Sequence, residues 1–203
     1  MSKLRIVPAT ELDLPVILDL IHALAEYEKL AHIVTATQGR LRETLFGIKP
    51  AAEVLLAHWD RECAGFAVFF ATYSTFLAQP GLYLEDLYVK PHLRGKGIGL
   101  ALLKHLARIA TERGCGRLEW GVLDWNQPAI QFYKKLGAVP LDEWTKYRLT
   151  GETLKSLALS GHRCPSSPAS RLGAVRLIPQ PGREHDYPPK VGNGLRIVSR
   201  QYR

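Results

Sequence analysis

The sequence predicts an α+β fold in which helices flank a central sheet. Short runs rich in Val, Leu, Phe and Tyr alternate with longer segments whose apolar residues recur at helical spacing. The 203 residues are 46% apolar, which suffices for one packed core. Near residue 159 this periodicity gives way to a stretch rich in Pro, Ser and Arg. We therefore expect one domain at 1–159 and a basic, disordered tail at 160–203.

The first half of the chain reads as a strand, two helices and a hairpin. After a short apolar run, Asp13 predicts a helix N-cap, with Pro15 in the first turn and apolar residues at helical spacing behind it. Two apolar runs joined by a short polar turn at 60–62 predict a hairpin. The elements expected here are a strand at 4–8, a helix after Asp13, a helix at 37–46, and strands at 53–59 and 64–73.

The second half alternates strands and helices around a glycine-rich loop. A run dense in Leu, Tyr and Val follows the turn at 79–81, and closely spaced glycines precede a helix that Gly114 would end. Gly137 would end a second helix. The elements expected here are a strand at 82–89, the loop at 94–99, a helix up to residue 114, a strand at 118–123, a helix at 128–136 and a strand at 147–150.

The formal charge of +8 is distributed unevenly. The tail at 160–203 holds eight of the 27 Lys and Arg and two of the 19 Asp and Glu, so the domain carries only +2. Arginines in the tail are scattered and have no aromatic stacking platform beside them, which makes nucleic-acid binding a weak alternative. No segment has the pattern of a signal peptide or a membrane helix, so we expect a cytoplasmic protein.

Cysteine and histidine spacing predicts no metal site. The three cysteines stand far apart, without a C-x-x-C pair or a histidine at ligand spacing. We expect Cys63 and Cys115 to be small packing residues.

The most informative segment is LEDLYV at 84–89, followed by RGKGIG at 94–99. A strand that leads into glycines and a helix N-terminus presents unpaired backbone N–H groups and a positive helix dipole to an anion. The loop lacks the G-x-x-x-x-G-K-[ST] spacing of a P-loop and the G-x-G-x-x-G spacing of dinucleotide folds. It predicts a phosphate site, with a glycine-rich turn at a helix start as the alternative.

Two motifs in this order resemble the Gcn5-related N-acetyltransferase (GNAT) superfamily. RGKGIG at 94–99 is similar to its R-x-x-G-x-G/A pyrophosphate loop, and WNQPAIQFYKKLGA at 125–138 is similar to its second motif. EYE at 26–28 and LYLED at 82–86 resemble the spermidine/spermine and thialysine acetyltransferase branch. The resemblance implies a mixed sheet that splays at the cofactor strand, acetyl-coenzyme A (acetyl-CoA) as donor, no metal, and a homodimer.

The resemblance also implies which residues bind the cofactor. Strand backbone would pair with the pantetheine arm, the glycine loop would cradle the pyrophosphate, and the helix at 128–136 would lie along the coenzyme. The residues implied are Leu87, Tyr88, Val89, Arg94, Gly95, Lys96, Gly97, Ile98, Gly99, Leu100, Asn126, Ala129 and Phe132.

Acetyl transfer to an amine needs a proton acceptor and a proton donor, because an amine with a pKa of about 10 is protonated and the leaving thiolate is basic. The resemblance assigns Glu85 as the base, through a water, and Tyr133 as the acid. The substrate residues it implies are Tyr27, Glu28, Glu85, Glu119, Trp120, and Asp142 or Glu143. Carboxylates in this set predict a small cationic amine, which is a diamine, a polyamine or a lysine-like amino acid. No cysteine stands beside a candidate base, so direct attack is favoured over an acetyl-enzyme.

Two other functions stay open. In one, the acceptor is a protein or peptide amine that reaches an open cleft. In the other, the basic tail binds a nucleic acid or an acidic partner, which predicts binding with a steep salt dependence.

Overall fold

The structure is a computed structural model that describes residues 4–159. The chain divides into two units, residues 1–141 and residues 142–203, and each is described by itself. The predicted basic tail at 160–203 lies outside the described residues.

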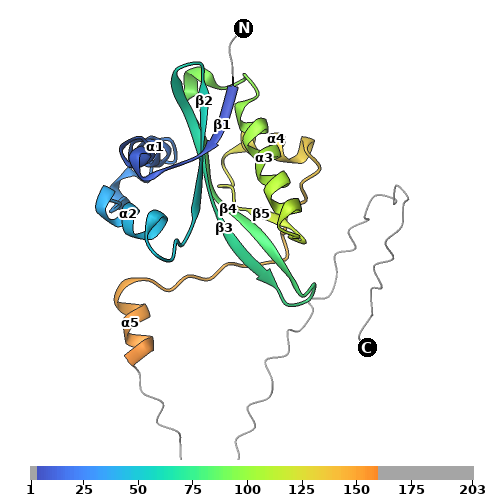
Figure 1. The fold of residues 1–203 in the computed structure, drawn as a ribbon. Coiled ribbons are helices and arrows are strands. Elements are labelled where there is room, and N and C mark those ends of the chain that lie inside the picture. Colours follow the sequence, from blue (N-terminus) through green and yellow to red (C-terminus); the bar gives the residue numbers. More distant parts are fainter. Residues whose placement is uncertain (1–3, 160–203) are drawn as a thin grey trace, which may run out of the picture. The chain divides into compact units, whose positions relative to one another are not determined.

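The first unit is built around one sheet with the strand order β1-β2-β3-β4-β5 (Figure 1). Neighbouring strands are antiparallel from β1 to β4, whereas β5 runs parallel to β4. The strands are β1 (Leu4–Pro8), β2 (Glu53–Trp59), β3 (Glu62–Ser74), β4 (Gln79–Val89) and β5 (Leu118–Trp120).

Helices cover both faces of this sheet (Figure 1). On one face lie α1 (Leu14–Tyr27) and α2 (Gln38–Phe46), and on the other lie α3 (Ile98–Glu112) and α4 (Gln127–Lys135). Short 3-10 turns stand at Glu11–Asp13, Ala31–Ile33 and Pro91–Leu93. A mixed sheet between two helical layers confirms the predicted α+β fold class.

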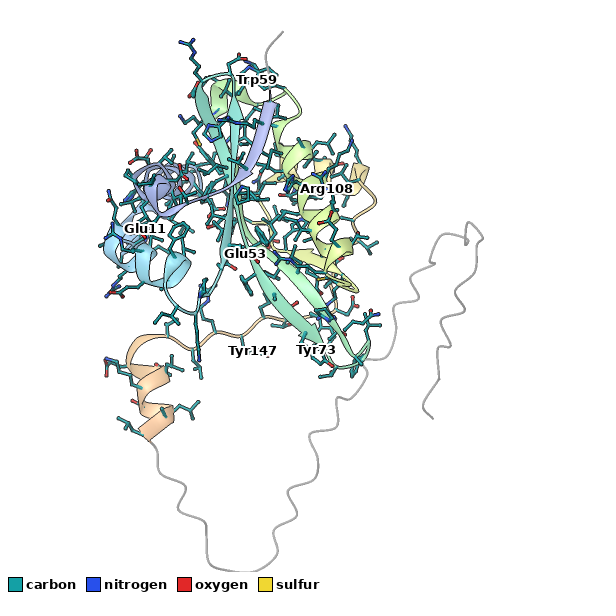
Figure 2. All side chains as sticks on the ribbon, viewed as in Figure 1. Glu11, Glu53, Trp59, Tyr73, Arg108 and Tyr147 are labelled. Atoms are coloured by element: carbon teal, nitrogen blue, oxygen red, sulfur yellow. The ribbon has the colours of Figure 1, made fainter. Side chains whose placement is uncertain are left out.

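Each face of the sheet has its own apolar core, and side chains fill the space between sheet and helices (Figure 2). Leu106 of α3 is fully buried on one face, and Ile17 and Leu20 of α1 are fully buried on the other. Phe66 and Ala67 are consecutive in β3, so strand alternation directs them to opposite cores. Burial of each Leu or Ile contributes roughly 1.5–3 kcal/mol, and these apolar stripes hold the helices against the sheet.

Some boundaries and one element differ from the prediction. β3 begins already at Glu62, β4 begins at Gln79 so that the turn before it lies at 75–78, and β5 ends at Trp120. The strand expected at 147–150 is absent, and a helix that was not predicted, α5 (Gly151–Leu159), follows instead. A strand needs a neighbour to be stable, and residues 147–150 belong to no sheet in the described chain.

Candidate active site

A cleft opens where β5 parts from β4. The two strands pair only along residues 82–84, and the pairing ends with Leu84 opposite Trp120. Over residues 85–89, β4 has β3 as its one strand neighbour within residues 4–159. A cavity of about 510 Å³ lies here, within the usual size range of small-molecule sites. The splay expected at this strand is therefore present.

The free edge of β4 offers backbone groups to a ligand. The Lys90 N–H donates to the Ala64 carbonyl of β3 over 2.8 Å. Because hydrogen-bonding groups alternate in direction along a strand, those of Tyr88 also face β3, whereas those of Leu87 and Val89 face the free edge. An extended chain with amide groups, such as a pantetheine arm, can pair at this edge.

The loop between β4 and α3 presents an anion-binding surface. Gly95 and Gly97 have φ angles of +77° and +80°, and no atom lies within 4 Å of where a Cβ would stand on either residue. Backbone N–H groups of residues 95–100 have no hydrogen-bond partner in the described part of the chain. Free N–H groups at the positive end of a helix dipole bind phosphate. The residues present therefore fit the pyrophosphate of acetyl-CoA.

A β-bulge in β4 lies at two adjacent carboxylates of the cleft. The strand register pairs Val68 of β3 with Asp86 and Phe69 with Leu84, which leaves Glu85 as the extra residue. In a regular strand the side chains of Glu85 and Asp86 would point to opposite faces. Both residues line the cleft, whose lining runs without a break from Leu84 to Val89 along this edge of the sheet.

Burial and mutual repulsion change the acidity of these carboxylates. Burial raises the pKa of Asp86 to about 6, and the negative charges of Glu85 and Glu28 add to the effect. Burial also raises the pKa of Glu28, the C-cap residue of α1. A carboxylate whose pKa lies near neutrality is a more effective general base at physiological pH than an ordinary one. The cleft thus holds a group suited to accept a proton.

Aromatic side chains of β5 and α4 line the cleft as well. The ring centroids of Trp120 and Tyr133 are 5.1 Å apart, and Phe132 lies 5.4 Å from Tyr133. Burial, and after it the nearby Tyr27, raises the pKa of the Tyr133 phenol. Tyr133 therefore keeps its proton at neutral pH and is able to donate it to a departing thiolate.

Residues 4–159 contain no group of three His, Cys, Asp or Glu side chains that could hold a metal ion. Over the same residues, every helix is too short or too polar to span a bilayer. Cys63 and Cys115 lie partly buried beside the apolar clusters, which confirms their predicted packing role.

Comparison with known proteins assigns the family. The model of the acetyltransferase (GNAT) family matches residues 20–138, a stretch that includes the glycine loop, the bulge and the aromatic side chains of the cleft. This chain belongs to the GNAT acetyltransferase family. The match confirms the resemblance that the two sequence motifs carry, and it makes the chain an N-acetyltransferase.

Named relatives agree with this assignment. A thialysine N-epsilon-acetyltransferase of Mus musculus is 38% identical over 169 residues, which cover 78% of this chain and 99% of the relative. An L-ornithine N5-acetyltransferase of Arabidopsis thaliana is 35% identical over 201 residues, with coverage of 77% and 87%. Among solved structures, an integron cassette protein from the mobile metagenome of V. cholerae is 30% identical with a TM-score of 0.66, and covers 77% of this chain and 98% of its own.

The acetyltransferase cleft gathers most of the residues that the sequence predicts for the site. The predicted residues that line it are Tyr27, Glu28, Glu85, Leu87, Tyr88, Val89, Arg94, Gly95, Gly97, Ile98, Gly99, Leu100, Trp120, Asn126, Ala129, Phe132 and Tyr133. Their individual roles stay predictions. Asp86 also lines the cleft although sequence reasoning did not select it. The sequence feature that could have identified Asp86 is its position next to Glu85 in the LYLED motif.

Glu119 is not among the residues that line the cleft. Its carboxylate forms an ion pair with Arg117 Nε at 2.7 Å. Glu119 and Trp120 are consecutive residues of β5, and strand alternation directs only one of two neighbours into the cleft. The predicted contact of Glu119 with the substrate stays a prediction.

Lys96 and Asp142 are also absent from the cleft lining. The Lys96 ammonium lies 5.3 Å from the ring centroid of Trp59. The predicted contact of Lys96 with the cofactor stays a prediction. Asp142 and its neighbour Glu143 are exposed residues of the second unit. Their predicted contact with the substrate stays a prediction.

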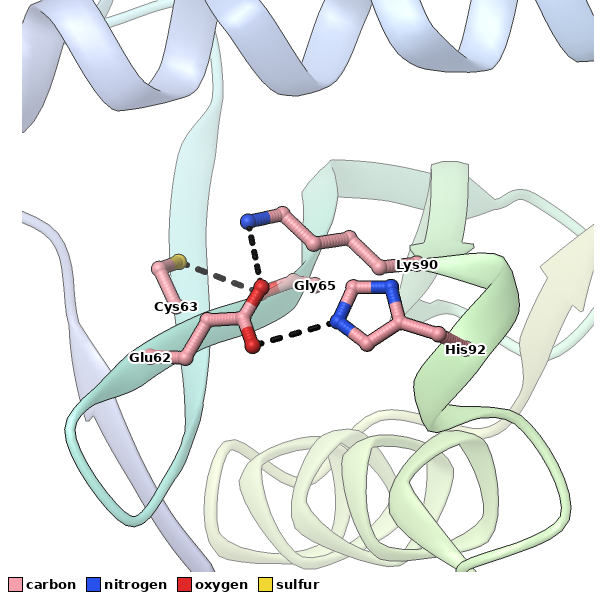
Figure 3. A network of polar contacts seen from close by, with 5 residues as sticks. All are labelled: Glu62, Cys63, Gly65, Lys90 and His92. Atoms are coloured by element: carbon pink, nitrogen blue, oxygen red, sulfur yellow. Dashed lines mark hydrogen bonds and ion pairs between the residues drawn. The ribbon is translucent and has the colours of Figure 1, made fainter.

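An ion-pair network anchors the segment that leads into the glycine loop (Figure 3). Glu62, at the start of β3, accepts a hydrogen bond from Lys90 Nζ at 2.9 Å and lies 3.1 Å from His92 Nε2. Hydrogen bonds from Lys90 and His92 hold the pKa of Glu62 below its usual range. Sequence reasoning missed this network because Glu62 and Lys90 are 28 residues apart.

Proposed function

We propose that this acetyltransferase moves the acetyl group of acetyl-CoA to the primary amine of a small cationic molecule by direct attack. One observation carries the proposal. The free edge of β4 has unpaired N–H groups of the glycine loop beyond one end and the carboxylates of Glu85 and Asp86 at the other, within a single cleft. An anionic coenzyme and a cationic amine are attracted to opposite ends of this edge.

The glycine loop and the free strand edge would hold the coenzyme. Backbone N–H groups of residues 95–100 and the Arg94 guanidinium would bind the pyrophosphate. Leu87 and Val89 would pair with the pantetheine arm through their backbone. When bound, acetyl-CoA supplies a thioester whose carbonyl carbon is the electrophile.

The carboxylates would receive the amine and its proton. An alkylammonium with a pKa of about 10 must lose a proton before it attacks. Negative charge on Glu28 attracts the cation, and Asp86, whose pKa is raised to about 6, accepts the proton. Glu85, the base that the resemblance implies, stands next to Asp86 in the bulge and can share this task through a water.

Tyr133 would donate a proton to the coenzyme A sulfur as the C–S bond breaks and the new C–N bond forms. Its raised pKa keeps the phenol protonated until that step. Cys63 and Cys115 do not line the cleft, and burial raises the pKa of the Cys63 thiol. Among the described residues no cysteine is therefore placed to carry the acetyl group, which supports direct attack by the amine.

The names of the relatives support a substrate class. Thialysine and L-ornithine, named in two relatives, are amino acids whose side chains end in a primary amine. Such a side chain, cationic before transfer, suits a cleft with three carboxylates. We propose amino acids of this kind, with diamines and polyamines of similar length, as the acceptors.

We also propose a homodimer in the cytoplasm. Trp144, Tyr147 and Leu159 of the second unit are each more than half exposed, at 64%, 93% and 83%. A second copy of the chain would cover apolar side chains of this kind. Light scattering should give the mass of two chains, and the mass of one chain would overturn the dimer. Cell fractionation tests the location.

The function is tested by release of coenzyme A thiol with acetyl-CoA saturating, across lysine, thialysine, ornithine, diamines and polyamines. We expect rapid release with one class of cationic amine, and mass spectrometry should find the acetyl group on its terminal nitrogen. If acetyl-CoA binds and no small amine reacts, the acceptor is a protein or peptide amine and the proposed substrate class is wrong.

A further inference from the structure

We infer that Tyr27 is a positioning residue for phosphate recognition. The sequence resemblance instead implies a contact between Tyr27 and the amine substrate. The inference rests on the proposed function in one respect, that acetyl-CoA occupies this cleft. Tyr27 helps to fix the orientation of the Arg94 side chain before the coenzyme binds, so that the guanidinium is ready to contact the pyrophosphate.

The Arg94 guanidinium is fixed on one side by contacts within the chain. Its Nε donates a hydrogen bond to the Val89 carbonyl over 2.9 Å. Its central carbon lies 4.4 Å from the ring centroid of Tyr27 and 5.7 Å from that of Tyr88. A guanidinium has five N–H donors, and the four on the two Nη atoms have no partner among the described residues. They remain available to an anion beside the glycine loop.

Tyr27 is itself held from the other side of the cleft. It is the last residue of α1, and its hydroxyl donates to Asn126 Oδ1 over 3.3 Å. The same oxygen accepts from the Ala129 N–H over 3.4 Å, which caps α4. The Tyr27 ring also lies 5.8 Å from the Trp125 ring. The ring that supports Arg94 is therefore anchored to a second structural element.

These contacts serve phosphate binding because they restrict a flexible side chain in advance. A free arginine samples many rotamers, and their loss on binding weakens affinity. Stacking on an aromatic face, together with one fixed Nε hydrogen bond, removes most of that freedom before the coenzyme binds. Tyr27 thus acts through Arg94 and need not touch the coenzyme.

The first test is calorimetric measurement of the coenzyme A dissociation constant for three proteins. Tyr27→Leu removes the aromatic face, and we expect a dissociation constant about fivefold to tenfold higher. Tyr27→Phe keeps the face and loses only the hydroxyl, so its dissociation constant should stay within about twofold of wild type. Equal affinity in Tyr27→Leu and wild type would overturn the inference.

A double-mutant comparison links the effect to Arg94. Arg94→Gln should weaken coenzyme binding, and adding Tyr27→Leu should change that weakened affinity by less than about twofold. If the two substitutions instead weaken binding independently, so that their effects multiply, Tyr27 does not act through Arg94 and the inference fails.

A truncated donor separates positioning from misfolding. S-acetylpantetheine has the thioester and the pantetheine arm without the pyrophosphate, so Tyr27→Leu should lower kcat/KM much less with this donor than with acetyl-CoA. An equal loss with both donors, or a rise confined to the amine KM, would place Tyr27 at the reacting end and overturn the inference. The coenzyme A dissociation constant can be measured without acetylation. The calorimetric test of Tyr27 therefore stays valid even if the proposed amine substrates are not acetylated.

Discussion

Trp120 and Tyr133 come from β5 and α4, and their ring planes meet at 60° with centroids 5.1 Å apart. Leu84 pairs with Trp120 at the last position where β4 and β5 are joined. Tyr133 therefore lies beside the point where the strands part. Packing against the apolar cluster of this face buries Tyr133, and that burial raises the pKa of the phenol.

Tyr133→Phe should lower kcat by about 100-fold or more, because it removes the proton donor for the leaving thiolate and keeps the packed ring. Thiol release under saturating acetyl-CoA measures kcat. Calorimetry should find the coenzyme A dissociation constant unchanged. A variant with wild-type kcat would mean that water protonates the thiolate and that Tyr133 only packs.

Asp86→Asn should make the protein more stable and less active. Folding raises the pKa of Asp86 from 3.8 to about 6, so the ionised form is disfavoured in the fold. This penalty is absent below the unfolded pKa, grows between the two values and is complete above about pH 6. Removing the charge should raise the free energy of unfolding by up to about 3 kcal/mol at neutral pH.

Urea unfolding at pH 7.5 and pH 4.5 tests the predicted pH dependence. The increase in the free energy of unfolding caused by Asp86→Asn should be smaller at the lower pH. Asp19→Asn, on the exposed face of α1, is the matched control and should change stability by less than about 0.5 kcal/mol. Loss of stability in Asp86→Asn at pH 7.5 would show that the ionised carboxylate is satisfied by partners in the fold.

Glu28→Gln should raise the KM of the cationic amine about tenfold, because one of three carboxylates in the cleft loses its charge. Glu28 also raises the pKa of Asp86, so the acid limb of the rate profile should move to lower pH. Steady-state kinetics across pH measures both effects. Glu26→Gln changes an exposed residue of the same helix outside the cleft and should leave both quantities unchanged. An unchanged amine KM in Glu28→Gln would remove Glu28 from the amine site.

Local patterns were enough to predict the glycine loop and the order of the helices and strands as far as α4. Ile17 and Leu20 recur at helical spacing, and positive φ angles at Gly95 and Gly97 are what glycine permits. The bulge could not be predicted from local sequence, because it depends on the register in which β4 pairs with β3. That pairing sets the face of the sheet to which Asp86 belongs.

One error of the prediction has a clear physical origin. The strand expected at 147–150 rested on local preference alone, and a strand depends on a partner that local preference does not supply. The outcome depends on long-range pairing in the sheet.

Gly97→Ala should weaken coenzyme binding by more than its cost in stability explains. Gly97 has a φ of +80°, so any Cβ costs about 1 kcal/mol in backbone strain. Gly114→Ala is the matched control, with a φ of +66° and equally open space around its Cβ, at the end of α3 away from the loop. Both variants should lose similar stability in urea, and only Gly97→Ala should lose affinity in calorimetry. Equal affinities would show that the phosphate does not approach this backbone.

Glu62→Gln should raise the KM of acetyl-CoA by about twofold, because Glu62 anchors Lys90 and His92 just before the glycine loop. Hydrogen bonds from Lys90 and His92 hold the pKa of Glu62 below its ordinary value of 4.5, so the stability that the ionised carboxylate adds is present above that pH and is lost as the pH falls further. In thermal unfolding, Glu62→Gln should therefore have a lower Tm than wild type at pH 7, and the two Tm values should converge at acidic pH. Glu53→Gln breaks a comparably exposed ion pair, with Arg113 at 2.8 Å, away from the loop. It should lower stability and leave the acetyl-CoA KM unchanged, and an equal rise in KM for both variants would mean that Glu62 has no specific effect on the loop.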